Sequence, residues 1–99
     1  MENNSSYWTV SITIARELNS IESAVLYAEM ESRYSLHGHV RYIGNKPYVE
    51  FTTEQIKKKT GLNYKVQKKC IRLLKDAGLI DVKLIGVPAR NHFSLINRM

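Results

Sequence analysis

Apolar and polar residues alternate with the period of an α-helix between Tyr64 and Ala77. The apolar positions fall within an arc of roughly 100° on a helical wheel, and they are Val66, Cys70, Leu73, Leu74 and Ala77. The opposite arc is basic and holds Lys65, Lys68, Lys69, Arg72 and Lys75. Asn63 is a suitable N-cap for such a helix, and Gly78 is a suitable residue to end it. The pattern predicts an amphipathic helix with one buried face and one basic face.

A shorter helix is predicted just before it, from Thr53 to a turn at Gly61. Thr52 can accept a hydrogen bond from the backbone N–H of Gln55, and the Gln55 side chain can accept one from Thr52, which makes a capping box. Gly61 permits the positive φ of a sharp turn. Leu62 is expected to fill the space between the two helices.

The first third of the chain predicts an extended segment followed by a helix. Tyr7 to Ile14 is β-branched and aromatic with partial alternation, which favours an extended conformation. Asn19 and Ser20 then offer an N-cap for a helix from Ile21 to Tyr34. Its principal apolar stripe consists of Ile21, Ala24, Val25 and Ala28, while another face carries Leu26 and Met30. Apolar residues on more than one side indicate a helix buried between other elements.

Two β-hairpins are predicted, one before and one after the two basic helices. The first spans Val40 to Phe51 around a turn at Gly44-Asn45-Lys46-Pro47. Its Lys46-Pro47 pair is expected in a projecting loop or at a sheet edge, because proline donates no hydrogen bond to a neighbouring strand. The second hairpin has strands at Leu79–Ile85 and His92–Asn97, joined by a loop at 86–91.

These elements predict a single α+β domain of the winged helix-turn-helix class. It has three main helices, a C-terminal hairpin as the wing, and an additional short hairpin between the first and second helices. A chain of 99 residues is too short for a second core of ordinary size. We expect residues 1–6 to be disordered, residues 7–97 to form the domain, and residues 98–99 to be a tail or the start of a further region.

Charge is distributed unevenly along the chain. The net charge is +6, yet residues 1–50 carry four basic and six acidic side chains, whereas residues 51–99 carry eleven basic and three acidic ones. A positive field at one end of the molecule attracts nucleic acid or an anionic membrane. The membrane is the weaker alternative, because the apolar helix faces are expected to be occupied by the core. Double-stranded DNA is therefore the expected partner.

The sequence offers few residues for other kinds of chemistry. No apolar run approaches the roughly 20 residues that span a bilayer. Cys70 stands alone in the apolar arc, and His37, His39 and His92 are scattered, so we expect neither a disulfide nor a metal site. No Ser/His/Asp set, acidic pair or phosphate-binding glycine loop can be assembled. We expect a cytoplasmic protein, associated with the nucleoid, that has no enzymatic activity and no cofactor.

The winged-helix arrangement assigns candidate DNA contacts to three groups. An α-helix fits the major groove, and the first residues of a recognition helix lie closest to the base edges. The candidate base-reading residues are Asn63, Tyr64, Lys65, Gln67 and Lys68. The candidate backbone contacts are Thr53, Lys57, Lys58, Lys59, Lys69 and Arg72. The candidate wing contacts to a minor groove or flanking phosphate are Arg90, Asn91 and His92.

The first two groups also have plainer interpretations. Lys57, Lys58 and Lys59 suit the negative end of a helix dipole and can be a solvated helix end. The basic face of the longer helix can serve solubility alone. Tyr64 can cover the core instead of contacting DNA.

Two segments also resemble a known family. They are EFTTEQIKKKTGLNYKVQKKCIRLLKDAGLI and the later GVPARNHFSLI. They resemble the N-terminal winged-helix domain of phage and plasmid replication proteins of Gram-positive bacteria, including replisome organisers. The resemblance runs from Tyr7 to Asn97, and its positions in the first helix are Ala24, Leu26, Tyr27, Met30, Ser32 and Arg33. Its wing pattern, with the aromatic residue one position later than usual, is Gly86, Pro88, Ala89, Arg90, Asn91 and Phe93.

The resemblance implies sequence-specific binding to origin repeats, for replication initiation or its control on a plasmid, phage or other mobile element. In longer members a C-terminal domain recruits replication machinery. A transcriptional repressor of the same fold and a protein-interaction module without DNA binding remain alternatives. A homodimer is a further alternative, through the N-terminal strand and first helix, where Trp8, Tyr27 and Met30 supply apolar area.

Overall fold

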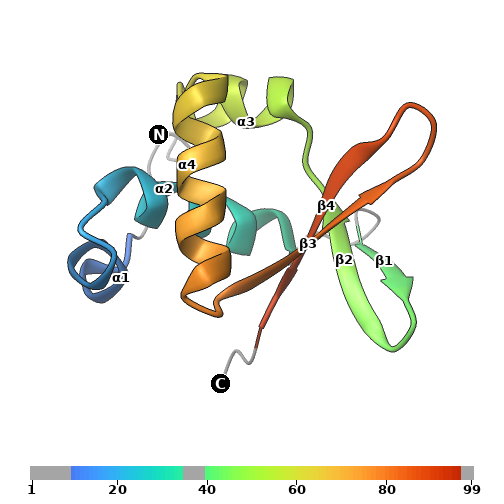
Figure 1. Ribbon diagram of the computed structural model, residues 1–99, viewed down its shortest axis with the longest axis horizontal. Coiled ribbons are helices and arrows are strands. Elements are labelled where there is room, and N and C mark those ends of the chain that lie inside the picture. Colours follow the sequence, from blue (N-terminus) through green and yellow to red (C-terminus); the bar gives the residue numbers. More distant parts are fainter. Residues whose placement is uncertain (1–9, 35–39, 97–99) are drawn as a thin grey trace, which may run out of the picture.

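The computed structural model describes residues 10–34 and 40–96, which form four helices and a four-stranded antiparallel sheet (Figure 1). The helices are α1 (Ile12–Glu17), α2 (Ile21–Tyr34), α3 (Thr53–Thr60) and α4 (Tyr64–Asp76). The strands are β1 (Val40–Ile43), β2 (Lys46–Glu50), β3 (Ile80–Ile85) and β4 (Arg90–Leu95). The predicted α+β class is confirmed, as are the long helix, the two basic helices and both hairpins.

The two hairpins join into one sheet through their inner strands, in the order β1-β2-β4-β3. β2 and β4 are antiparallel and bring Glu50 opposite His92. β3 and β4 pair along six positions and end at the pair Ile85 and Arg90. The sheet therefore connects the segment just before α3 with the hairpin that follows α4.

Lys46 and Pro47 lie inside β2, so the projecting-loop alternative is wrong, whereas the sheet-edge alternative holds for Pro47, which pairs with β1 on one side only. Pro47 is opposite Tyr42 of β1, and the pairing of β2 with β4 begins only at Val49. The missing N–H of proline therefore costs no hydrogen bond to β4. The Pro47 carbonyl is also used, because it accepts a hydrogen bond from the Tyr34 hydroxyl at 3.1 Å.

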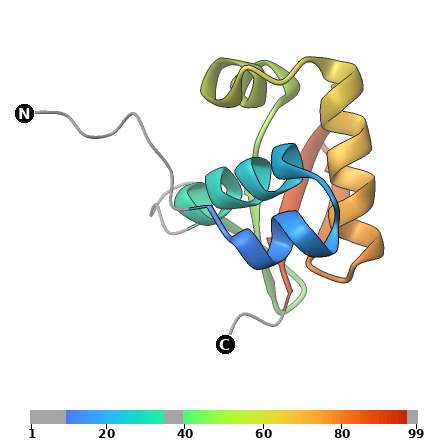
Figure 2. The ribbon, with the colours of Figure 1, turned by 90° about the vertical axis from the view of Figure 1, so that its left-hand side faces the viewer.

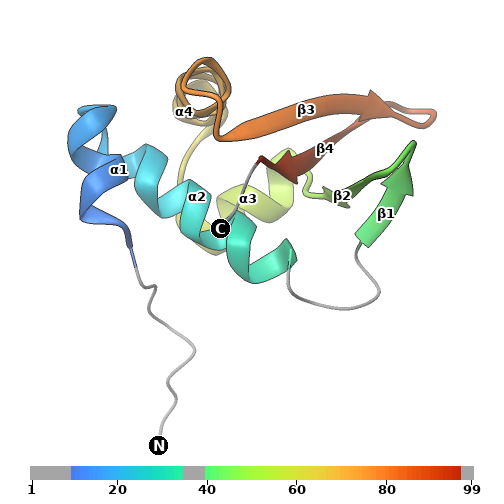
Figure 3. The same cartoon turned by 90° about the horizontal axis from the view of Figure 1, so that it is seen from below.

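The hydrophobic core lies between α2, α3, α4 and one face of the sheet. Figure 2 shows α2 in front of the strands, with α3 above it and α4 upright to its right. The core side chains are Leu26, Tyr27, Met30, Val49, Phe51, Ile56, Cys70, Leu74, Ile80, Phe93 and Leu95. Figure 3 shows the helices gathered on one side, while the β3–β4 turn projects away from them. Burial of these apolar side chains is the main favourable contribution to folding.

α2 is buried on more than one side, as its apolar residues on two faces predicted, and Ala24 and Ala28 of the predicted stripe are among the buried residues. Its N-cap is Ser20, which accepts a hydrogen bond from the backbone N–H of Ser23 at 3.1 Å. Ile21 is exposed, whereas Met30 is fully buried with Leu26 in the core. α2 contacts α1, α3, α4, β2 and β4, so it needs apolar residues on several sides.

The residues predicted to form a dimer surface are not available for one. Tyr27 and Met30 belong to the core and are almost completely buried. Trp8 lies outside the described residues. The prediction is wrong for the two described residues, because α2 is covered by α1 and α4 within the same chain.

α1 is a short helix where the sequence predicted an extended segment. Ser11 caps it by accepting a hydrogen bond from the backbone N–H of Ile14 at 3.1 Å. The prediction is wrong for Ile12 to Ile14, and residues 7–9 lie outside the described residues. The cap and the contact of α1 with α2 override the β propensity of this segment, because Ile14 and Leu18 pack against the core.

Tyr48 and Asp81 form a polar contact across the sheet. The buried Tyr48 hydroxyl donates a hydrogen bond to Oδ2 of Asp81, and Nζ of Lys46 lies 4.0 Å from the same oxygen. The hydrogen bond to Asp81, together with burial, raises the pKa of Tyr48 to about 12. The same hydrogen bond, with a smaller contribution from Lys46, outweighs desolvation and lowers the pKa of Asp81. The folded state therefore favours a neutral Tyr48 and an ionised Asp81.

The contact predicts how stability depends on pH. Replacing Tyr48→Phe should lower the free energy of unfolding by about 1.5 kcal/mol near neutral pH, because Asp81 loses a charged hydrogen bond. Asp81 has a lowered pKa, so its contribution should be present above the unfolded value of about 4 and be lost as the pH falls below it. Tyr48 has a raised pKa, so its contribution should be complete below about pH 10 and be lost towards pH 12. Urea titrations of both proteins from pH 3 to pH 11 test this, and a difference that stays constant across that range would contradict it.

Candidate nucleic-acid interface

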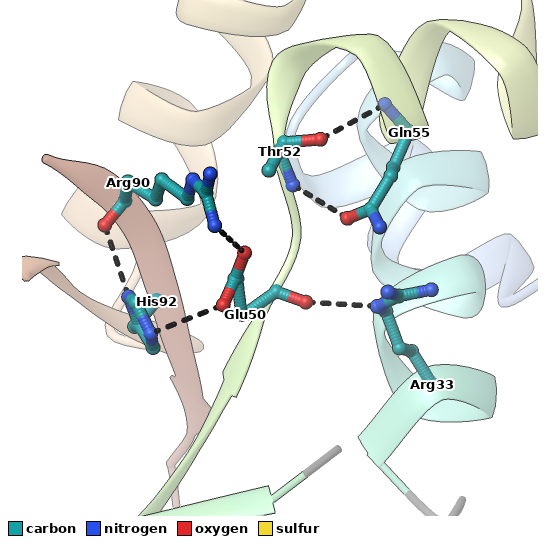
Figure 4. A network of polar contacts seen from close by, with 6 residues as sticks. All are labelled: Arg33, Glu50, Thr52, Gln55, Arg90 and His92. Carbon is teal, nitrogen blue, oxygen red and sulfur yellow. Dashed lines mark hydrogen bonds and ion pairs between the residues drawn. The ribbon is translucent and has the colours of Figure 1, made fainter. Parts of the chain in front are cut away.

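α3 and α4 meet at a turn whose geometry follows the capping signals in the sequence. The Thr52 hydroxyl accepts from the backbone N–H of Gln55 at 3.2 Å, and Oε1 of Gln55 accepts from the N–H of Thr52 at 2.9 Å (Figure 4). The predicted capping box is therefore present. Gly61 ends α3 with a φ of 80°, which favours glycine. Asn63 starts α4 and accepts from the N–H of Val66 at 3.0 Å.

The side chain of Gln67 connects α4 to α3 and to the turn between them. It is only 2% exposed. Its Nε2 donates one hydrogen bond to the carbonyl of Thr53 at 3.1 Å and another to the carbonyl of Leu62 at 2.8 Å. Both amide protons are used inside the protein. The prediction that Gln67 reads a base is therefore wrong, because its position on α4 faces α3 instead of solvent.

The outer surface of α3 and α4 is densely basic. Eight cationic side chains on these helices are exposed, and they are Lys57, Lys58, Lys59, Lys65, Lys68, Lys69, Arg72 and Lys75. None of the eight forms an ion pair with another described residue. Because no carboxylate in the described part of the chain is paired with them, their positive field extends into the solvent. We call these eight residues the basic surface.

A groove of ≈ 800 Å³ lies between α4 and the β3–β4 hairpin, next to the basic surface. Its α4 side is formed by Tyr64, Gln67, Lys68, Ile71, Arg72 and Lys75. Its hairpin side is formed by Val82, Leu84, Pro88, Ala89, Arg90 and Asn91. The start of α3 contributes Thr52, Thr53 and Glu54. The groove thus combines cations on one side with apolar side chains on the other.

The first turn of α4 presents Tyr64 to the solvent. Its ring is 59% exposed, and Nζ of Lys68 lies 5.5 Å from the ring centroid. Tyr64 therefore does not cover the core, which was the plainer interpretation of this residue. Lys65 is also exposed. Asn63 is exposed, but its Oδ1 is occupied as the N-cap of α4, so only its amide N–H groups remain for another partner.

The predicted wing residues do not form the tip of the hairpin. The turn consists of residues 86–89, so Arg90 and Asn91 are the first residues of β4. Arg90 points back to β2, where its Nη1 lies 3.3 Å from Oε2 of Glu50 (Figure 4). His92 is 3% exposed, and its Nδ1 lies within hydrogen-bond distance of the Arg90 carbonyl at 2.9 Å. The prediction that His92 contacts DNA is therefore wrong, because the pairing of β2 with β4 buries it.

Arg33 and Glu50, which were not among the predicted site residues, hold this region together. The Nε of Arg33 donates to the Glu50 carbonyl at 2.8 Å, and the Arg33 guanidinium lies 4.7 Å from the centroid of the Phe51 ring. The Glu50 carboxylate bonds Arg90. These contacts fix α2 and β4 to the segment that leads into α3. The partners are 17 and 40 residues apart, so no local spacing in the sequence could reveal them.

Within residues 10–34 and 40–96, no three His, Cys, Asp or Glu side chains gather closely enough to hold a metal ion. None of the described helices is both long and apolar enough to cross a bilayer. Comparisons of the chain with protein-family models, curated proteins and solved structures find no match.

Replacing Gln67→Ala should lower the free energy of unfolding by about 2–4 kcal/mol, because two hydrogen bonds between α4 and the α3 region are lost and the removed side chain leaves a cavity. The matched control is Lys68→Ala, which changes the next residue of the same helix but removes only an exposed side chain. That variant should unfold within about 0.5 kcal/mol of the wild type. Equal urea midpoints for the two variants would show that the Gln67 hydrogen bonds do not hold α3 against α4.

Proposed function

We propose that this chain is a winged helix-turn-helix domain that binds double-stranded DNA sequence-specifically, in replication initiation or its control on a plasmid, phage or other mobile element. The observation that carries the proposal is the basic surface, whose eight exposed cations have no acidic partner among the described residues. A surface of this kind is suited to a polyanion, because each contact with a phosphate releases a condensed counterion.

The order of the elements supports the winged-helix assignment. α3, a glycine turn and α4 are followed directly by the β3–β4 hairpin, and β2 joins that hairpin from before α3. In this assignment α4 is the recognition helix and lies in the major groove, which admits one α-helix. α3 crosses the DNA backbone, and the β3–β4 hairpin reaches the adjacent minor groove.

The geometry sharpens the role of each candidate residue. Tyr64, Lys65 and Lys68 are exposed on the first turns of α4 and are the proposed base-reading residues, together with the free amide protons of Asn63. The proposed backbone contacts are Thr53, Lys57, Lys58, Lys59, Lys69 and Arg72. Asn91, which lines the groove, is the one predicted wing residue that keeps its side chain free for DNA in this proposal.

The same interface serves a transcriptional repressor equally well, because fold alone does not decide the process in which DNA is bound. The assignment to replication on a mobile element comes from the resemblance of the α3–α4 segment and the 86–93 segment to replication proteins. A domain with this function acts at the nucleoid in the cytoplasm. Selection of bound duplexes from a random pool at physiological salt tests DNA binding and identifies the site. Recovery of no preferred sequence would contradict sequence-specific binding.

Binding to a selected duplex should weaken steeply with salt. With about five to seven phosphate contacts, the slope of log K against log salt concentration should be near −5. Raising the salt from 50 to 200 mM should then reduce the affinity about 1,000-fold. Fluorescence anisotropy at several salt concentrations measures the slope. A slope near zero would show that the basic surface does not contact the DNA phosphates.

Substitutions on the two helices should have different effects on specificity. A triple Lys→Gln change at Lys57, Lys58 and Lys59 should weaken binding to all duplexes alike and make the salt slope about 2 to 3 units less negative. Tyr64→Ala combined with Lys65→Gln should instead reduce the preference for the selected site over random DNA by about 10- to 100-fold. If both variants lost affinity equally for selected and random duplexes, α4 would not be the recognition helix.

A further inference from the structure

The turn between β3 and β4 carries apolar side chains that are fully open to solvent. It consists of Gly86, Val87, Pro88 and Ala89, and Val87 is completely exposed. Leu84, just before the turn, is 70% exposed. None of these side chains has a charge or a hydrogen-bonding group. The turn therefore cannot pair with a phosphate through its side chains, nor can it read a base edge by hydrogen bonds.

The turn is held in a fixed position at the end of the sheet. β3 and β4 remain paired up to Ile85 and Arg90, and Gly86 has a φ of 100° that favours glycine. Figures 1 and 3 show the turn projecting away from the helices. Arg90 does not extend beyond the turn, because its guanidinium bonds to Glu50 of β2. What the hairpin presents at its end is therefore apolar.

The turn also belongs to the same groove as the basic surface. Pro88 and Ala89 line one side of that groove, and Lys68 and Arg72 line the other. A partner seated on α4 therefore lies next to the turn. The cations of α4 favour a polyanion as that partner. The apolar turn beside them suits the apolar part of such a partner, which in DNA is the stack of bases.

From this arrangement we propose that the β3–β4 turn is an apolar wedge, led by Val87, that enters the DNA minor groove beside α4 and bends the duplex. The inference rests on the proposed function. Apolar side chains that enter the minor groove partially unstack a base step and bend DNA towards the major groove. The minor groove carries a degenerate hydrogen-bonding pattern, so an apolar turn forfeits little direct base recognition there.

A wedge at this position contributes to specificity through the deformability of the DNA. Pyrimidine–purine steps, such as TA and CA/TG, are the easiest to kink. Duplexes selected by the protein should therefore carry such a step at a constant distance from the bases read by α4. The turn selects these sequences without a hydrogen bond to any base.

The test uses a selected duplex with a fluorophore at each end, bound to the wild type or to Val87→Ser. Energy transfer between the ends should report a bend of some tens of degrees for the wild type. Val87→Ser should reduce the bend and weaken binding about threefold to tenfold. The matched control is Ile21→Ser, another exposed apolar residue that lies on α2, away from the groove. It should leave both the bend and the affinity unchanged. Because Val87 is completely exposed, its replacement should not disturb folding, and thermal melting of each variant verifies this.

The outcomes separate the wedge from the proposed function. Salt-dependent binding of a straight duplex would overturn the wedge and leave DNA binding in place. Wild-type bending and affinity in Val87→Ser would likewise overturn the role of the turn. A selected site without a pyrimidine–purine step near the hairpin would contradict the proposal that the turn selects sequences by their deformability. Failure of the wild type to bind any duplex would overturn both proposals.

Discussion

The side-chain amide of Gln67 is bonded to two backbone carbonyls, one at the start of α3 and one in the turn before α4. The Gln67 side chain is almost completely buried, so its amide would be left without partners if these bonds were lost, which is costly. The bonds set the position of α4 relative to α3, and therefore the spacing of the lysines on both helices. They also set one side of the groove, because residues of α4 line it. Every functional proposal for this chain depends on that geometry.

A second set of contacts fixes the hairpin relative to the helices. Glu50 lies directly before the segment that enters α3, and it bonds Arg33 of α2 through its carbonyl and Arg90 of β4 through its carboxylate. One residue thus ties a helix, the sheet and the start of α3 together (Figure 4). The Glu50 carboxylate also partly neutralises Arg90. The unpaired positive charge therefore lies mainly on α3 and α4 instead of on the hairpin. The two sides of the groove are chemically different for this reason.

Local signals in the sequence predicted α2, α3 and α4, because caps act within three or four residues, whereas α1 was predicted as an extended segment despite its N-cap at Ser11. The capping box of Thr52 and Gln55 and the N-cap Asn63 form as predicted. The errors arise where distant parts of the chain meet. Gln67 was predicted to read a base, although helical spacing places it next to Leu74 at the edge of the apolar arc, and in the structure its side chain bonds to α3. His92 is buried because β4 pairs with β2, where Glu50 lies opposite it. Glu50 precedes His92 by 42 residues, so no spacing within a strand could predict this contact.

The basic surface also has a consequence for the free protein. Eight like charges held on two adjoining helices, which carry only Glu54 and Asp76 as acidic residues, repel one another and oppose folding. In the proposed complex the phosphates of DNA would remove this repulsion, so its relief would contribute to the binding free energy. Under the proposed function, substitutions that neutralise these lysines would stabilise the domain and weaken DNA binding, so selection for stability and selection for binding would act on them in opposite directions.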